Sequence, residues 1–593
     1  MTQCYEILGR NDTGKEKHER ARDEEYGLWQ GVGAYEADTA VVLECVFARL
    51  PPAELWRCGA VCRAWRRAAG DRALWRRLLL PRAAPHALRA LADTQAAAEH
   101  TEGEWSWRAE YGLQAARWRR CGRLPRGAGA APLQCAALHD DGACLALVDE
   151  DAHVTIWEHT RSLVDGDAAD EWAMRWSGVA SPEWRGAALA QWAPRARRLL
   201  LAGRLALVER HETLVLQFDE EWCSRVACRG ASGPGAAGCW VDDDTFLSLR
   251  LRLLAPRRAC TTLWLNSATQ EIYSEFAAVT TPLLRIYNEA AAHFSHILVA
   301  EVPSEDTTAC QTKTNNLTEE FSSEPSASYF CALRPQKISK DKKRKLLIAA
   351  GGVAGGARGQ AQALVAWALP ALELPMMWVD DQLAQRVARR RARPRAPDAA
   401  PDHVPSEDDV RALCSAPAAA CCLHAQIFGI VLHPSGGCVW ATTDAGVSCV
   451  SLPALTPLLR LPRAAAPHAP DLPSHYLVPC VDEDYFVTPA GVGSGRVCLW
   501  TVRSARRGAQ LSHGAPAVAA FLPRGPGAPR APTDPRAPTA PRAPGAPHAA
   551  PAPHATRAPR RLLVLATDGL HVYVGEPTQL SPDFKLRHCV ENN

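Results

Sequence analysis

The chain has 593 residues, 47% of them hydrophobic, which is enough for two domains with linkers and for one large buried core. Its 67 Lys and Arg residues nearly balance 64 Asp and Glu residues, so the net charge of +3 gives no reason to expect a nucleic-acid partner. No signal-peptide core and no apolar run of about 18 residues occurs, so we expect no membrane insertion and a cytoplasmic protein. The 21 cysteines are scattered without the spacing of zinc ligands, and we expect neither a metal nor another cofactor.

The first predicted elements are two short helices that meet at a proline corner, after a disordered segment at residues 1–37. Four apolar residues fall at i, i+3, i+4 and i+7, the spacing of one helix face: Leu43, Val46, Phe47 and Leu50. Pro51 and Pro52 end that helix, and a second helical stripe follows, made of Leu55, Cys58, Gly59 and Cys62. An orphan helical hairpin could show such stripes too.

Residues 38–82 resemble an F-box, because three submotifs occur in order at the family spacing: Leu50–Leu55, Val61–Arg67 and Leu74–Leu78. One departure is that Asp38-Thr39-Ala40 stands where the family usually has Leu-Pro. The resemblance implies that this module binds a Skp-type adaptor through Leu50, Pro51, Pro52, Leu55, Val61, Cys62 and Trp65. For Trp65 and Trp75, packing inside the hairpin is an equally good interpretation, since Trp is common both in cores and at interfaces.

Residues 83–124, rich in Ala and Arg, are predicted to be a helical linker, after which the pattern changes to short strands. Leu133–Leu138, Ala143–Val148 and His153–Trp157 are apolar runs separated by acidic turns. This order resembles one blade of a WD-repeat β-propeller, with Trp157 as the closing tryptophan. A β-sandwich is the alternative, although Trp157, Trp264 and Trp500 at matching strand ends favour the propeller.

The strand pattern recurs along residues 125–580, which we predict to be one propeller before a tail at 581–593. Clear copies lie at 427–450 and 476–500, degenerate ones begin at Cys239 and Phe294, and the last copy is interrupted, with strands at 517–522 and 561–574. Polar or Pro-, Ala- and Arg-rich inserts interrupt the propeller at 301–345, 385–418 and 523–560. At about 40 to 45 residues per blade, roughly seven blades fit, and the last strands must meet the first blade.

An F-box followed by WD repeats resembles the substrate receptors of cullin-RING (SCF-type) ubiquitin ligases. Within that F-box/WD repeat family the likeness is carried by Ser106–Tyr111, Gly238–Trp240 and Cys260–Asn266. The resemblance implies a receptor without catalytic residues: the F-box docks the Skp-type adaptor of the cullin scaffold, and the propeller binds the protein to be ubiquitinated. The sequence agrees in having no phosphate-binding Gly loop, GxSxG or HExxH motif.

Two further interpretations concern single motifs. Some relatives dock a propeller on the damage-binding cullin adaptor through Trp-Asp-x-Arg, and here that place reads Trp500-Thr501-Val502-Arg503, without the aspartate. Arg503 is therefore either a contact or a solvated strand-end charge. The basic run Lys337–Lys345 could direct the protein to the nucleus as well. As alternatives to the receptor we keep a WD-repeat scaffold with a drifted F-box, favoured by the absent Leu-Pro, and an enzyme built on the propeller, which no residue constellation supports.

Overall fold

The computed structural model describes residues 42–82, 91, 106–124, 130–160, 171–208, 210–232, 238–255, 258–270, 280–288, 294–303, 343–351, 363–369, 418–462, 479–490, 494–522 and 560–576. The chain forms two compact units. Unit 1 comprises residues 1–82, 105–112 and 578–593, and unit 2 comprises residues 83–104 and 113–577.

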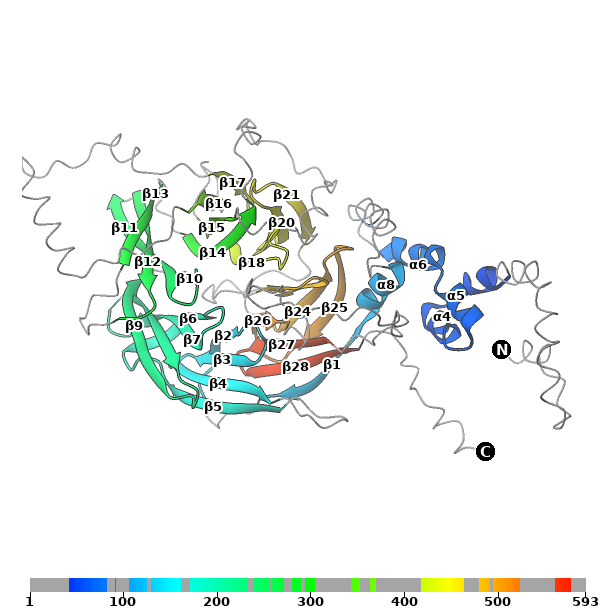
Figure 1. Ribbon diagram of the computed structural model, residues 1–593, viewed down its shortest axis with the longest axis horizontal. Coiled ribbons are helices and arrows are strands. Elements are labelled where there is room, and N and C mark those ends of the chain that lie inside the picture. The colour runs from blue at the N-terminus through cyan, green and yellow to red at the C-terminus, as the bar shows by residue number, and fades with distance from the viewer. Residues whose placement is uncertain are drawn as a thin grey trace, which may run out of the picture. The chain divides into compact units, whose positions relative to one another are not determined.

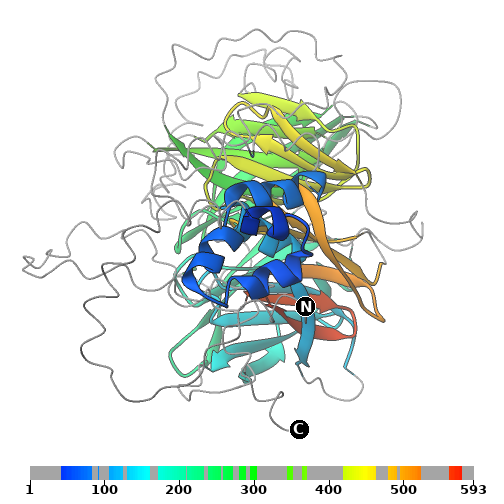
Figure 2. The ribbon, with the colours of Figure 1, turned by 90° about the vertical axis from the view of Figure 1, so that its right-hand side faces the viewer.

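Unit 1 is a small helical module, whose helices are blue in Figures 1 and 2. Residues 42–47 are helical. They are followed by α4 (Pro52–Cys58), α5 (Arg63–Ala69), α6 (Arg72–Leu79) and the 3-10 turn η2 (Leu80–Arg82). The last helix is α8 (Trp107–Ala115), whose residues up to 112 belong to this unit.

The starts of these helices follow from residues that satisfy or remove a free backbone N–H. Pro52 is the first residue of α4, where its missing N–H costs nothing. At the start of α5 the Sγ of Cys62 accepts a hydrogen bond from the N–H of Trp65 at 3.4 Å. The carboxylate of Asp71 does the same for Leu74 in α6 at 3.2 Å. The predicted proline corner is present, but Cys62 caps the third helix instead of lying within the second.

Unit 2 contains seven four-stranded antiparallel sheets among its described residues, arranged around a ring in Figure 1. The first four blades are β2 (Leu133–Leu138), β3 (Cys144–Asp149), β4 (His153–Thr160) and β5 (Glu171–Val179); β6 (Trp184–Trp192), β7 (Arg198–Leu205), β8 (His211–Phe218) and β9 (Ser224–Ser232); β10 (Gly238–Trp240), β11 (Thr245–Ala255), β12 (Arg258–Ser267) and β13 (Thr280–Asn288); and β14 (Phe294–Pro303), β15 (Lys343–Gly351), β16 (Ala363–Ala368) and β17 (Ala419–Cys422).

The last three blades have the same strand order. They are β18 (Ile427–Leu432), β19 (Cys438–Thr443), β20 (Gly446–Ser451) and β21 (Pro457–Pro462); β22 (Cys480–Val481), β23 (Tyr485–Pro489), β24 (Arg496–Thr501) and β25 (Arg506–Ser512); and β26 (Ala517–Phe521), β27 (Arg560–Ala566), β28 (Gly569–Glu576) and β1 (Arg117–Arg123). Unit 2 is therefore a seven-bladed β-propeller, as the sequence predicted, and the sandwich alternative is wrong.

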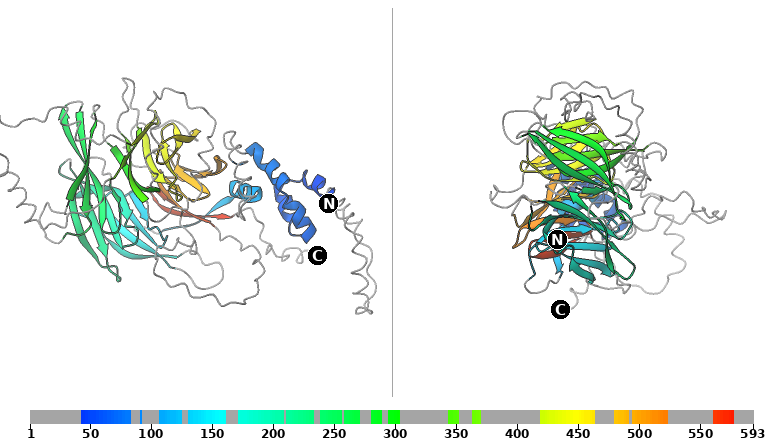
Figure 3. Two further views of the ribbon diagram at one scale, coloured as in Figure 1. Left: turned by 45° about the horizontal axis from the view of Figure 1, so that its top comes forward. Right: turned by 90° about the vertical axis from the view of Figure 1, so that its left-hand side faces the viewer.

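The ring is closed by a strand from the other end of the chain. The last blade is completed by β1, which pairs antiparallel with β28 from Arg117 opposite Glu576 to Arg123 opposite His571. Figure 3 shows the two strands side by side, β1 in light blue and β28 in red. Apolar residues of the first and last blades share one core, including Leu145, Leu563 and Leu565. The expected meeting of the first and last blades is thus present, and hydrogen bonds across 450 residues of sequence secure it.

Two blades use the same tight turn between their first and second strands. In the first blade the N–H of Gly142 donates to the carbonyl oxygen of His139, and in the fifth blade Gly436 donates to His433, both at 2.8 Å. Both glycines have φ of 72°, a left-handed backbone that side chains with a Cβ rarely adopt. The local sequences HDDG and HPSG therefore set these corners by themselves.

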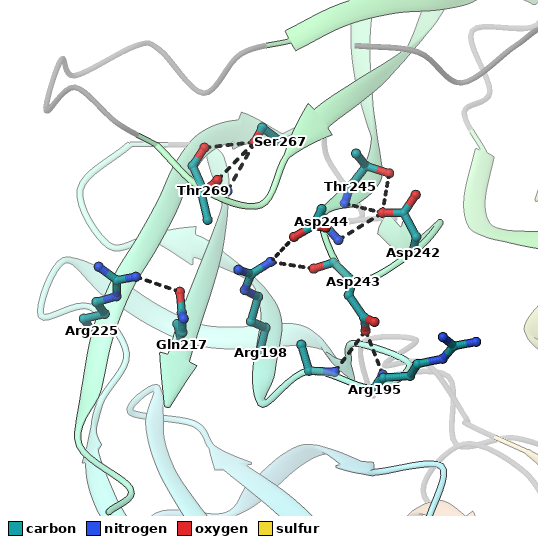
Figure 4. Close-up of polar contacts among 11 residues, drawn as sticks. Arg195, Arg198, Gln217, Arg225, Asp242, Asp243, Asp244, Thr245, Ser267 and Thr269 are labelled. Atoms are coloured by element: carbon teal, nitrogen blue, oxygen red, sulfur yellow. Dashed lines mark hydrogen bonds and ion pairs between the residues drawn. The ribbon is translucent and has the colours of Figure 1, made fainter. Parts of the chain in front are cut away.

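Neighbouring blades are also joined by polar contacts between their turns, as Figure 4 shows for the second and third blades. The carboxylate of Asp243 accepts hydrogen bonds from the backbone N–H groups of Arg195 and Ala196, at 2.7 and 2.9 Å. Arg198 donates to the carbonyl oxygen of Asp243 and to the carboxylate of Asp244, at 2.7 and 2.8 Å. This acidic turn is thus engaged in holding two blades together.

The structure differs from the sequence expectations in several places. The second blade, at 184–232, was not among the predicted copies, and Arg117–Arg123, expected within the helical linker, forms β1 instead. The ends of the insert predicted at 301–345 belong to β14 and β15. Most of the three predicted inserts, the disordered segment at 1–37 and the tail at 581–593 lie outside the described residues.

Candidate functional site

Among the described residues of unit 1, three large apolar side chains are exposed, and we call them its apolar surface: Val42, Val46 and Val61. Val42 and Val46 are one turn apart on the first helix and are 61% and 50% exposed, while Val61, in the loop before α5, is 63% exposed. Phe47, next to Val46, packs edge-on against Trp65 of α5 with ring centroids 5.3 Å apart. Val46 is thus next in sequence to one partner of this contact, and Val61 lies in the loop before the helix that carries the other.

The seven residues that the F-box resemblance assigned to adaptor binding divide by burial. Pro51, Val61 and Cys62 are exposed, while Leu50, Pro52 and Trp65 are half-buried. Leu55 is only 1% exposed and lies inside the module. The exposed and half-buried side chains can contact a partner directly, whereas Leu55 packs inside the module and supports the helix that carries it. Their binding role stays a prediction.

An aromatic core holds the helices of unit 1 together. Trp56 of α4 and Trp75 of α6 have ring centroids 4.8 Å apart, and Tyr111 of α8 lies 5.4 Å from Trp75. The guanidinium of Arg108 sits 4.0 Å from the centroid of Trp56, and burial lowers its pKa, with Arg66 as a smaller cause. The indole N–H of Trp75 donates to the carbonyl oxygen of Ala69 at 2.7 Å.

This core decides between two interpretations that the sequence left open. Trp75 is wholly buried, so it packs inside the module, while Trp65 is half-buried beside the apolar surface. It also shows what residues 106–111 do: Trp107, Glu110 and Tyr111 are buried as α8 packs on the hairpin. Sequence reasoning missed Val42, because the apolar stripe was counted from Leu43.

The second predicted contact lies in the sixth blade. Trp500 is 8% exposed and belongs to the core shared with the fifth blade, and Arg503 is half-buried in the turn between β24 and β25. Arg503 faces His433, whose pKa burial lowers to about 4; Asp482 opposes that shift and Arg503 adds to it. The place of the tryptophan is structural, and a binding role for Arg503 stays a prediction.

Within the described part of the chain, no three His, Cys, Asp or Glu side chains gather as metal ligands would. The cysteines there are free thiols, and burial raises the pKa of several, including Cys135, Cys239 and Cys421, to about 12. Such thiols are packed as small apolar residues. Among the helices that the structure describes, none has the length and apolar content needed to cross a bilayer.

Comparison with known proteins gives one family match and two relatives of low identity. The F-box-like family matches residues 41–81, which is the hairpin that carries the apolar surface. The F-box/WD repeat-containing protein 5 of Homo sapiens is 24% identical over 271 residues, covering 43% of this chain and 42% of that protein. Residues 41–81 are thus similar to the F-box-like family, and part of the chain is similar to an F-box/WD repeat protein.

Other similarities add less. The F-box/WD repeat-containing protein 5 of Rattus norvegicus is likewise 24% identical over 271 residues, with the same coverage, so the match spans less than half the length of either relative. The match to the crystal structure of Saccharomyces cerevisiae Sqt1 covers 74% of this chain and 83% of that one, with 10% identity and a TM-score of 0.34, too low to carry an argument.

Proposed function

We propose that this protein is the substrate-recognition subunit of an SCF-type cullin-RING ubiquitin ligase. Unit 1 docks a Skp-type adaptor, and through it the cullin scaffold, while the propeller binds the protein to be ubiquitinated. The observation that carries the proposal is the apolar surface, because Val46 and Val61 remain exposed beside a packed core within an F-box-like hairpin. Large apolar side chains left exposed on so small a module are typical of a surface that a partner covers.

The receptor needs no catalytic residue of its own. Holding a substrate lysine next to a charged conjugating enzyme raises the effective concentration of the two reactants, which replaces a bimolecular encounter by one within a complex. What the chain contributes is rigidity. In unit 1, Leu55, Trp56 and Trp75 fix the helices beneath the apolar surface, so little ordering is left to be done when the adaptor binds.

Binding of the adaptor is tested best with side chains that the fold does not need. In a Val46→Asp, Val61→Asp variant of the full chain, two exposed valines become charged without a change in the core. Covering a valine contributes about 1.5 kcal/mol or more to binding, so the two substitutions together should raise the dissociation constant by about 100-fold. The matched control is Leu207→Asp, which changes a side chain that is 97% exposed on the propeller.

Isothermal titration with the purified adaptor gives the answer. The proposal expects tight binding by the wild type and the Leu207→Asp control and weak binding by the valine variant. Equal affinity of all three proteins, or no binding by the wild type, would overturn it. The second outcome would favour the alternative function, a propeller scaffold with a drifted F-box, which the absence of Leu-Pro at residues 38–40 favours.

Three finer assignments belong to the same proposal. The half-buried Arg503 offers a contact for the damage-binding cullin adaptor, although Thr501 stands where the motif has aspartate. An Arg503→Glu variant that binds that adaptor as well as the wild type would exclude this contact. The second assignment is that the protein works in the cytoplasm. The third is that the basic run Lys337–Lys345 also directs part of it to the nucleus. Imaging a tagged chain in which that run is neutralised tests the third assignment, because the nuclear fraction should then disappear.

A further inference from the structure

The F-box hairpin carries a strong positive charge. Residues 42–82 contain nine arginines, no lysine and three acidic residues, Glu44, Glu54 and Asp71, so this short segment has a net charge of +6 while the whole chain has +3. Two helices hold most of it. The sequences of α5, RAWRRAA, and of α6, RALWRRLL, contain six arginines and no acidic residue. Five of them have side chains that the structure describes, all exposed, and we call these the arginine band: Arg66, Arg67, Arg72, Arg76 and Arg77.

The acidic residues of the hairpin are too few to balance this charge by number. Glu54 pairs with Arg57 at 2.5 Å and Asp71 caps α6, so two of the three acidic side chains are already engaged. A surface with such an excess of positive charge gains when an oppositely charged surface covers it.

Some of these guanidinium groups also support the fold, which is the plainer explanation of their presence. Arg66 donates to the carbonyl oxygen of Gly59 at 3.1 Å, and Arg77 donates to the carbonyl oxygen of Ala48. The guanidinium of Arg76 lies 5.9 Å from the ring of Trp107. Packing does not account for Arg67, which is exposed on α5, and in each of these contacts the positive charge still faces solvent.

In sequence, the arginine band follows the apolar surface. Val61 directly precedes Cys62, the capping residue of α5, so the most exposed valine leads straight into the arginine-bearing helix. An apolar centre with an arginine-rich border is a common composition of protein–protein interfaces. Charges around such a centre act mainly on the rate of association, because they attract a partner before contact is made.

We infer that the arginine band steers a Skp-type adaptor with an acidic docking surface onto the apolar surface. The inference rests on the proposed function and deepens it by naming the chemistry of the partner. The valines determine how long the complex lasts, and the arginines determine how fast it forms.

Stopped-flow association of the full-length chain with the purified adaptor at 50, 150 and 500 mM NaCl tests this division. The test variant is Arg67→Glu, Arg72→Glu, which changes the charge of two exposed side chains in the band by −4 in total. The matched control is Arg185→Glu, Arg210→Glu, which makes the same change at two exposed positions of the propeller. Thermal unfolding of each variant shows that it is folded.

For the wild type the association rate constant should fall about tenfold from 50 to 500 mM NaCl. The band variant should associate about tenfold more slowly at 50 mM and lose most of this salt dependence, with a smaller change in the dissociation rate, while the propeller control behaves as the wild type. Tight binding with a rate independent of salt, or equal slowing in both variants, would overturn the inference and leave the proposed function standing. No association at any salt concentration would overturn both.

Discussion

Closure of the propeller by β1 can be tested through Trp118. This side chain lies over Gly575 of β28, and its ring meets that of Tyr485 in the sixth blade edge-on, with centroids 5.6 Å apart. It is half-buried and belongs to the core shared by the sixth and seventh blades. Replacing a fully buried Trp by Ala costs about 3 to 5 kcal/mol, so Trp118→Ala should reduce the free energy of unfolding by about 2 kcal/mol.

Because β1 is an edge strand whose only neighbour in its sheet is β28, the loss of stability should be local as well as global. Hydrogen exchange measured by mass spectrometry should show faster exchange of the β1 amides in the variant, and thermal unfolding should begin a few degrees lower. Arg117→Ala is the control, since Arg117 is exposed on the same strand and its replacement should change stability by less than about 0.5 kcal/mol. Unchanged exchange of β1 in Trp118→Ala would refute the argument that this strand closes the ring.

Three further predictions concern other parts of the chain. Leu55→Ala should destabilise unit 1 by about 2 to 5 kcal/mol, because Leu55 is fully buried. Adaptor binding should fall only to the extent that circular dichroism shows a loss of helix. A variant that keeps its full helix content but loses binding would contradict the supporting role of Leu55. Gly203→Ala should lower the free energy of unfolding by about 1 to 3 kcal/mol, since a Cβ there would lie 2.1 Å from the ring of Trp184. Denaturant unfolding measures this change, and an unchanged denaturant midpoint would contradict that packing. Finally, the pKa of His433 is lowered to about 4 in the folded chain, so its imidazole is protonated more readily in the unfolded chain. Its contribution to the free energy of unfolding should be complete above pH 6.5. That free energy should fall by about 3 kcal/mol as the pH drops to 4. The slope of stability against pH should be shallower in His433→Gln than in the wild type, and equal slopes would contradict the assignment.

Local sequence determined much of this protein. The two prolines end one helix and begin the next, because proline removes a backbone donor wherever it stands. The HDDG and HPSG turns bend the chain where glycine tolerates a positive φ, and alternating apolar runs between turns identified six of the seven blades in part. The F-box-like hairpin was likewise readable, since its motifs lie within one short stretch.

Other features were decided only by the tertiary structure. The sequence of β1, RWRRCGR, has no strand pattern, and it becomes a strand because β28 offers hydrogen bonds from more than 450 residues away. The resemblance to an F-box gave Leu55 and Val61 the same role as adaptor contacts, yet one is buried and the other is exposed. Periodicity shows that a helix has an apolar face, but which of its residues remain open depends on what packs against it, and here that is α8, brought back by a chain segment beyond the hairpin.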